Sequence, residues 1–383
     1  MKPVSKLIRF VIFLSVVTFY PLELEAQETA SEWEEEGAIS GERISLQGYG
    51  ELHYNNPKTG ATVPSDDDPA QMDFHRMVIG VSYQFSDRVI LHTEVDFEHA
   101  ASEMELEFAH IDFLVSEELN FRAGSVLMPV GPLNEFHEPP LFYSVERPYV
   151  QTYIIPTSWQ EGGAGIFGSL QNKAQYRIYA VSGLNAGGFS GSKGIRGGRG
   201  KVAKSPSDDL ALVGRMQYTG VPGFDAGFSF YWGGAGQSDS TLEGAAVRIL
   251  ESDVRFRRKG FDLKAVFVHV DVSKADRISD STGQTVGETL LGWYVEGAYN
   301  LLNLLSSPVD QSAVVFIRFE SFDTHHRVPI GFAADPSNNR DVITGGIAYY
   351  PHLDVAIKAD FERWEDAENT TETRLNLATT YRF

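Results

Sequence analysis

The feature that most constrains the fold of this chain is an alternation of apolar and polar residues that returns in segment after segment. In RVILHTEVDFE, apolar or neutral residues take every second position from Val89 to Phe97, and Glu94 and Asp96 stand between them. Successive side chains of a strand point to opposite faces, whereas a helix groups apolar residues three and four positions apart. The pattern therefore predicts strands with one apolar and one polar face.

About sixteen such segments follow one another along the chain. In one of them the parity slips near Phe108, which indicates either a β-bulge or a displaced strand boundary. The predicted segments begin near Ile44, Phe74, Val89, Met104, Leu119, Gly163, Ala174, Leu210, Phe224, Val247, Phe261, Leu290, Ser312, Val342, Leu353 and Thr371.

The connections between these segments alternate in length. Short ones, such as SDR at 86–88 and RKG at 258–260, alternate with mostly long ones, such as 129–162, 183–209 and 271–289. Tight turns on one rim and long loops on the other are typical of outer-membrane barrels. We therefore predict an all-β fold, a transmembrane antiparallel β-barrel of about 16 strands, with short periplasmic turns and long extracellular loops.

A soluble β-sandwich also shows alternation, but it buries its apolar face against a second sheet. In hydrocarbon, only helices and closed sheets satisfy every backbone hydrogen bond. The chain finishes on RLNLATTYRF, an alternating segment with Tyr381 and Phe383 on its apolar side. We expect this segment to close the barrel, with the aromatic side chains of Tyr381 and Phe383 in the periplasmic aromatic girdle.

The N-terminal region predicts export. The apolar stretch Phe10–Tyr20 follows Lys2, Lys6 and Arg9, the pattern of a signal peptide, and it is too short to span a bilayer. We expect a signal peptide at 1–26, an acidic leader at 27–42 and a barrel at 43–383, with 129–162 as a constriction loop within it.

Charge and cysteine content exclude several classes of partner. The formal net charge is -20, which disfavours nucleic acid as a partner. The chain has no cysteine, so neither disulfides nor thiolate metal sites are available to it. The partners expected are outer-membrane lipid and small hydrophilic solutes or anions.

If the apolar set faces lipid, the polar set lines the lumen, where rings of charge determine ion selectivity. An arginine or lysine in the lipid face near the midplane would cost about 2–4 kcal/mol. The alternative for each lumen residue is a purely structural ion pair with a neighbouring strand. The candidate pore-lining residues are Arg76, Glu94, Asp96, Arg122, Arg318, Glu320, Lys358 and Arg374.

Two connections stand out by composition. The segment 129–162 is rich in proline and aromatic residues, so we expect it to fold back into the barrel or to pack on the barrel wall. The glycine-rich segment 187–205 is basic, and it would collect anions at the outer mouth, bind acidic lipid headgroups or form a disordered tip. Its candidate anion-collecting residues are Lys193, Arg196, Arg199, Lys201 and Lys204.

Three stretches within Gly48–Gly168 have a recognisable pattern: FHRMVIGVSYQFSDRVILHTEVDFE, IDFLVSEELNFRAGSVLMPVGPLNEF and FYSVERPYV. With these stretches, this part of the chain resembles the phosphate-selective porins of the O and P family. The resemblance implies a sixteen-stranded barrel, usually trimeric, that passes small solutes passively. The inward charges here are of both signs, unlike the basic ladder of the phosphate-selective members, so we expect only a weak anion preference.

Enzyme motifs are weak in this sequence. GAGIFG at 163–168 has the spacing of a dinucleotide fingerprint, but SLQNKAQYRIYAV after it predicts a turn and a strand in place of a helix. His325 and His326 are adjacent, so on a strand they would point to opposite faces and could not share one metal; solvated loop histidines are the expected reading.

We expect no catalytic residues, metal or cofactor. The function expected is a porin, with a non-conducting surface adhesion protein as the alternative.

Overall fold

The structure is a computed structural model, and it describes residues 39–40, 43–59, 70–305 and 310–383. The expected signal peptide and most of the acidic leader lie outside the described residues. No described helix is long and apolar enough to cross a membrane.

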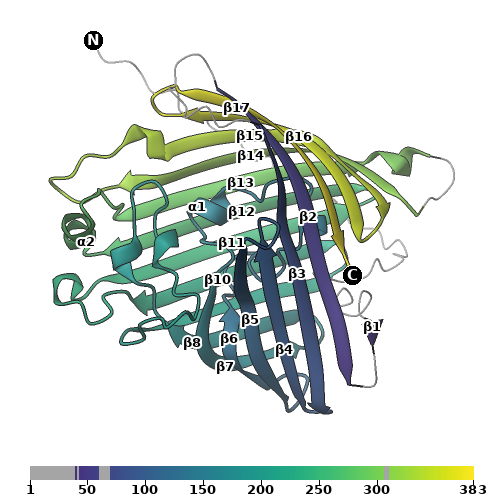
Figure 1. Cartoon of the computed structure of the whole chain (residues 1–383), viewed down its shortest axis with the longest axis horizontal. Helices are drawn as coiled ribbons and strands as arrows, with labels where there is room; N and C mark the ends of the chain where they lie inside the picture. Colours follow the sequence, from purple (N-terminus) through teal and green to yellow (C-terminus); the bar gives the residue numbers. More distant parts are fainter. Residues whose placement is uncertain (1–38, 41–42, 60–69, 306–309) are drawn as a thin grey trace, which may run out of the picture.

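Sixteen antiparallel strands form a closed ring, in which every strand pairs with its neighbours in sequence and β17 pairs with β2 (Figure 1). A further strand, β1 (Ile39–Ser40), pairs with β2. Each strand of the ring begins within three residues of its predicted start, so the predicted fold is confirmed. The strands are β2 (Ile44–Thr59), β3 (Gln71–Ser86), β4 (Val89–Glu98), β5 (Glu103–Leu114), β6 (Asn120–Leu127), β7 (Gln160–Leu170), β8 (Ala174–Ser182), β9 (Leu210–Val221), β10 (Phe224–Gly234), β11 (Ala246–Arg258), β12 (Phe261–Ser273), β13 (Thr289–Asn300), β14 (Ser312–Arg327), β15 (Asn339–His352), β16 (Val355–Asp366) and β17 (Thr371–Arg382).

Helical turns occur in the connections. The α-helices are α1 (Val150–Tyr153), which lies inside the ring, and α2 (Ala275–Thr282), which lies at the long-loop rim (Figure 1). The other turns are η2 (Pro139–Leu141), η3 (Ala186–Gly188), η4 (Arg196–Gly198), η5 (Ser240–Leu242), η6 (Leu301–Leu304) and η7 (Pro336–Asn338).

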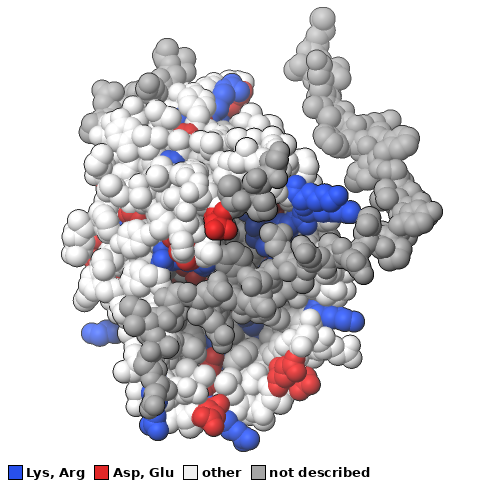
Figure 2. All heavy atoms as spheres, turned by 90° about the vertical axis from the view of Figure 1, so that its right-hand side faces the viewer, with Lys and Arg blue, Asp and Glu red and all other residues white. Residues whose placement is uncertain are grey.

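The two faces of the wall follow the alternation of the sequence. On β11, Leu250, Val254 and Phe256 are exposed on the outside, whereas Glu251 and Asp253 are buried on the inside. Apolar residues on the outside need hydrocarbon as their solvent, and a closed ring leaves no strand edge unpaired in it. At the short-turn end of the molecule, the surface carries scattered charges of both signs (Figure 2).

Two irregularities in the ladder place polar side chains inside. Between β4 and β5, Val95 pairs with Leu106 and Glu94 pairs with Phe108, so Glu107 on β5 is an extra residue without an opposite partner. This is the bulge that the parity slip near Phe108 indicated. Between β2 and β3, Glu51 pairs with Arg76 and Leu52 pairs with Phe74, which leaves His75 on β3 as the extra residue.

The interior is only partly polar. Connections 128–159 and 183–209 pack in one apolar cluster against a wall sector in which β8–β13 predominate, and this wall contributes Tyr179, Tyr231, Val268 and Leu290. The expectation that polar residues line the whole lumen is therefore wrong for this sector. The physical reason is that an inward loop rich in apolar residues needs apolar wall to pack against.

Candidate functional site

The connection between β6 and β7, hereafter the inward loop (128–159), crosses the interior as its composition predicted. Its backbone is held by charged side chains of the wall. Nζ of Lys358 donates to the carbonyls of Pro139 and Ser144, at 2.6 and 2.9 Å. Asp360 accepts a hydrogen bond from the backbone N–H of Val145 at 2.5 Å, so β16 binds the loop through both a cation and an anion.

Strand β14 binds the same loop. Arg318 donates to the Ser144 hydroxyl at 2.7 Å and to Glu320 at 2.7 Å, and Glu320 accepts from the N–H of Val150 at 3.1 Å. Arg318, Glu320 and Lys358 are all buried. The structure therefore places these predicted pore-lining residues on the inner face, as expected, but beneath the loop and away from solvent.

A second set of predicted residues lies on β3 and β4. Arg76 is buried among carboxylates, with Glu51 at 3.1 Å and Asp96 at 3.7 Å. Glu94 accepts a hydrogen bond from the amide of Gln47 at 3.0 Å. All three residues face inward, and Arg76 and Asp96 form the cross-strand ion pair of the structural alternative, whereas Glu94 has, among the described residues, only the hydrogen bond from Gln47.

The remaining two predicted residues keep more contact with solvent. Arg122 forms a two-point contact with Asp112, at 2.7 and 2.8 Å, and Arg374 donates to Glu372 at 2.7 Å. The Arg374 guanidinium also lies 4.6 Å from the ring centre of Trp364. Both arginines are inward-facing and only partly buried.

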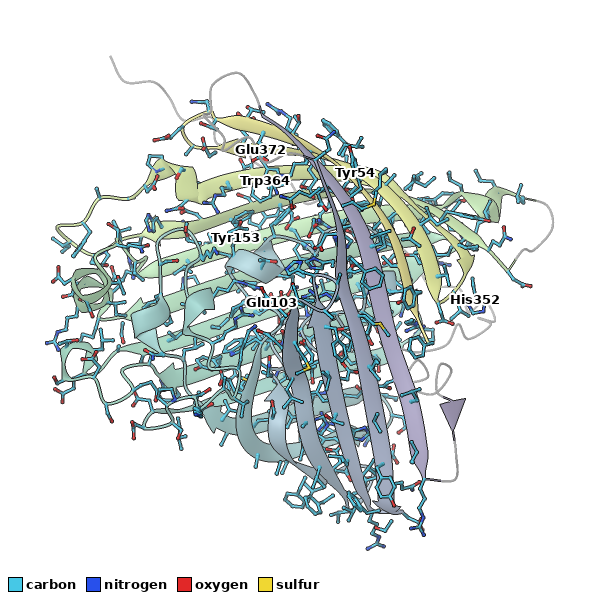
Figure 3. All side chains as sticks on the ribbon, viewed as in Figure 1. Tyr54, Glu103, Tyr153, His352, Trp364 and Glu372 are labelled. Atoms are coloured by element: carbon cyan, nitrogen blue, oxygen red, sulfur yellow. The ribbon has the colours of Figure 1, made fainter. Side chains whose placement is uncertain are left out.

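Aromatic rings fix α1 of the inward loop against the wall. Tyr153 stacks on Phe322 with ring centres 5.1 Å apart, and Trp364 lies edge-on to Tyr153 at 6.4 Å (Figure 3). Tyr149 donates through its hydroxyl to Glu362 at 2.8 Å. Gly292 on β13 lets α1 approach closely, since a Cβ there would lie 2.8 Å from Ile154.

The basic connection 183–209 supports the inward loop from the long-loop side. Arg199 donates to the carbonyls of Thr157 and Ser158, both at 2.7 Å, and Arg196 donates to the Thr157 carbonyl at 2.9 Å. Burial, with the like charge of Arg199 beside it, lowers the pKa of Arg196 to about 9, so the guanidinium remains charged at neutral pH.

The other cations of this connection lie differently. Lys201 pairs with Glu105, whereas Lys193 and Lys204 are exposed. Phe189 and Ile195 are buried, which contradicts the reading of a disordered basic tip. Of the five candidate anion-collecting residues, Arg196, Arg199 and Lys201 therefore already have partners within the protein.

Arg147, on the inward loop, was not among the residues singled out from the sequence. It donates to the Ser158 hydroxyl at 2.9 Å, and within the described part of the chain it forms no ion pair. Only the Glu-Arg pair in FYSVERPYV could have indicated Arg147 from the sequence, because a loop has no periodicity from which the direction of a side chain can be predicted. The neighbouring Glu146 accepts a hydrogen bond from Asn55 at 3.0 Å.

The two weak enzyme signals have structural explanations. GAGIFG lies within strand β7, where a Cβ on Gly165 would come within 2.7 Å of the Tyr179 ring. His325 is buried on β14 and contacts the Thr285 carbonyl at 2.9 Å, whereas His326 is exposed. The expected opposite faces are found, but the reading of both as solvated loop histidines is wrong for His325.

Comparison with known proteins supplies one relative in sequence. The chain is 32% identical over 360 residues to an uncharacterized protein of Aquifex aeolicus strain VF5, covering 89% of this chain and 80% of that protein. The two chains belong to one family. No family profile matches the chain.

Solved structures share the fold at low sequence identity. The outer membrane channel DcaP of Acinetobacter baumannii is 12% identical, with 94% of this chain and all of that chain covered and a TM-score of 0.58. An anion-selective porin of Comamonas acidovorans (8%; 89% and 99% covered; TM-score 0.55) and the trimer form of OmpT of Vibrio cholerae (8%; 89% and 99%; 0.54) are also similar. The shared fold and the apolar outer face identify an outer-membrane β-barrel of the bacterial type.

Proposed function

We propose that this protein is a non-enzymatic outer-membrane channel through which small hydrophilic solutes and ions diffuse passively, with a weak preference for anions. The observation that carries the proposal is the exposure of the inner-wall ion pairs near the short-turn rim. In these pairs the cation contacts solvent, and its carboxylate partner is hidden behind it.

Three pairs show this asymmetry. The exposed side-chain fraction is 34% for Arg255 and 7% for Asp262. It is 22% for Arg122 against 6% for Asp112. For Lys264 and Glu296 the fractions are 16% and 3%. A permeating ion therefore meets the positive member of each pair first, and water-excluded carboxylates compensate only part of that charge.

The same pairing argues against a tight phosphate site. A phosphate site requires cations that are free to donate several hydrogen bonds, whereas Arg122 and Arg255 each spend two on a carboxylate. We therefore propose the porin function implied by the resemblance, without phosphate specificity. The exposed Lys193 and Lys204 would draw anions to the outer mouth, and a homotrimer is the proposed assembly by analogy with the trimer form of OmpT.

Planar-bilayer recordings test the proposal. We expect stable conductance steps, a reversal potential in a KCl gradient that shows weak anion preference, and loss of that preference in the double variant Arg122→Gln, Arg255→Gln. The matched control is Arg363→Gln, which removes an exposed arginine paired with Glu365 at 2.8 Å on the outside of β16.

Three results would contradict the proposal. A folded barrel that is electrically silent would favour the surface-binding alternative. Cation preference in the unaltered protein, or an equal shift in the Arg363→Gln control, would show that the exposed inner cations do not set selectivity.

A further inference from the structure

A second group of polar residues lies at the long-loop rim, apart from the ion pairs just described. It consists of Asp73 near the start of β3, His75 two residues later, and His99 in the turn between β4 and β5. Oδ2 of Asp73 lies 2.8 Å from Nδ1 of His99 and 3.2 Å from Nδ1 of His75. The three potential ligand atoms lie within 4.8 Å of one another.

The backbone holds this cluster in place. His75 is the extra residue of the β3 bulge, and its ring stacks on that of His53 with centres 4.8 Å apart and planes 7° apart. Asp73 stands opposite His53 in the strand register. His99 has φ of 50°, and its N–H donates to the His75 carbonyl at 3.1 Å. The side chains thus converge because of strand register and a tight turn, not because of a long loop.

We propose that Asp73, His75 and His99 form a binding site for a divalent transition-metal ion of the zinc class. Imidazole nitrogen and carboxylate oxygen are ordinary zinc ligands, at about 2.0–2.2 Å from the metal. Tetrahedral geometry then separates two ligand atoms by about 3.3 Å, close to the 2.8 and 3.2 Å found here. Calcium and magnesium prefer all-oxygen sets, so they fit this cluster poorly.

The cluster is open to an ion from solution. The side chains of Asp73, His75 and His99 are 28%, 30% and 46% exposed, so water can complete the coordination shell. An ion on Nδ1 of His75 places the remaining ring proton on Nε2. This change removes the long contact of 3.3 Å with Nη2 of Arg76, which keeps its carboxylate neighbours on β2 and β4.

Direct binding to the full-length protein, refolded in detergent, tests the site. We expect calorimetric titration to show one Zn²⁺ per chain, and His99→Ala and Asp73→Asn each to weaken binding at least about tenfold. Excess Mg²⁺ should not displace the zinc. The matched control is His352→Ala, because His352 lies 3.3 Å from Asp354 at the opposite rim (Figure 3), where the described residues supply no third ligand.

Several outcomes would overturn the site: no saturable binding, binding unchanged in both His99→Ala and Asp73→Asn, or an equal loss in His352→Ala. Circular dichroism of each variant separates lost binding from lost folding, and Asp73→Asn keeps the side-chain volume. Because the titration reads zinc and not current, its result is independent of the proposed channel function.

Discussion

At the scale of single residues, Arg147 is a positive charge in an electrostatically unfavourable position. It is a cation on the inward loop that forms no ion pair within the described residues. Burial, and then the like charge of Arg76, lower its pKa, which means that the charged form is destabilised where it stands. Because proteins often trade stability for activity, a destabilised charge of this kind is a candidate for a role in selectivity.

We therefore predict opposite effects of Arg147→Gln on selectivity and stability. Glutamine can still donate to Ser158 but carries no charge, so the anion preference in a KCl gradient should fall. The thermal midpoint in detergent should stay the same or rise, because a partly buried unpaired charge is removed. A variant with a markedly lower midpoint would show that Arg147 holds the loop in place and is not a selectivity residue.

At the scale of elements, the alternation of apolar and polar residues predicted the strands, which repeat, but not the contacts inside the barrel, which do not. Strand starts and the bulge near Phe108 follow from parity. The apolar sector of the inner wall could not be predicted from parity. In AVFVHV on β12, Ala265 and Phe267 face outward and Val266 and Val268 face inward, so both faces are apolar. A segment that is apolar on both faces has no parity to indicate what covers its inner face. The inward course of the loop was predicted by its proline and aromatic content, but its contacts were not.

The packing of α1 on β13 gives a prediction at this scale. Gly292→Ile would place side-chain atoms where Ile154 and Val150 now lie, so α1 should be displaced from the wall. Overpacking of this kind costs about 1–3 kcal/mol. We expect a lower thermal midpoint and a larger or noisier single-channel conductance.

Gly297→Ala is the matched control on the same strand. Gly297 faces the outside, where an added Cβ comes no nearer than 3.5 Å to Leu263, so the midpoint and the conductance should not change. Equal effects in both glycine variants would show that the strand itself, and not the contact with α1, is sensitive.

At the scale of the whole molecule, the closed ring with its long connections at one rim could be predicted, because alternating strands and alternating loop lengths leave few other folds. The candidate site could be predicted only in part. Parity placed Arg318 and Lys358 inside, but their burial depends on a loop far away in sequence. Which member of an ion pair meets solvent depends on cross-strand register, as for Arg255 and Asp262, and no local pattern reveals it.

The whole-molecule charge and the lumen charges should act over different distances, and ionic strength separates them. The formal net charge is -20, which favours cations near the protein. The Debye length is about 30 Å at 0.01 M, 10 Å at 0.1 M and 3 Å at 1 M salt. We predict that reversal potentials show the strongest anion preference near 0.1 M KCl, where the exposed inner cations act and the distant acids are screened. The preference should weaken or reverse near 0.01 M and fade near 1 M.

The double variant Arg122→Gln, Arg255→Gln should lose the preference near 0.1 M but keep the low-salt shift toward cations. Anion preference that grows steadily down to 0.01 M would mean that the overall negative charge does not reach the permeation path.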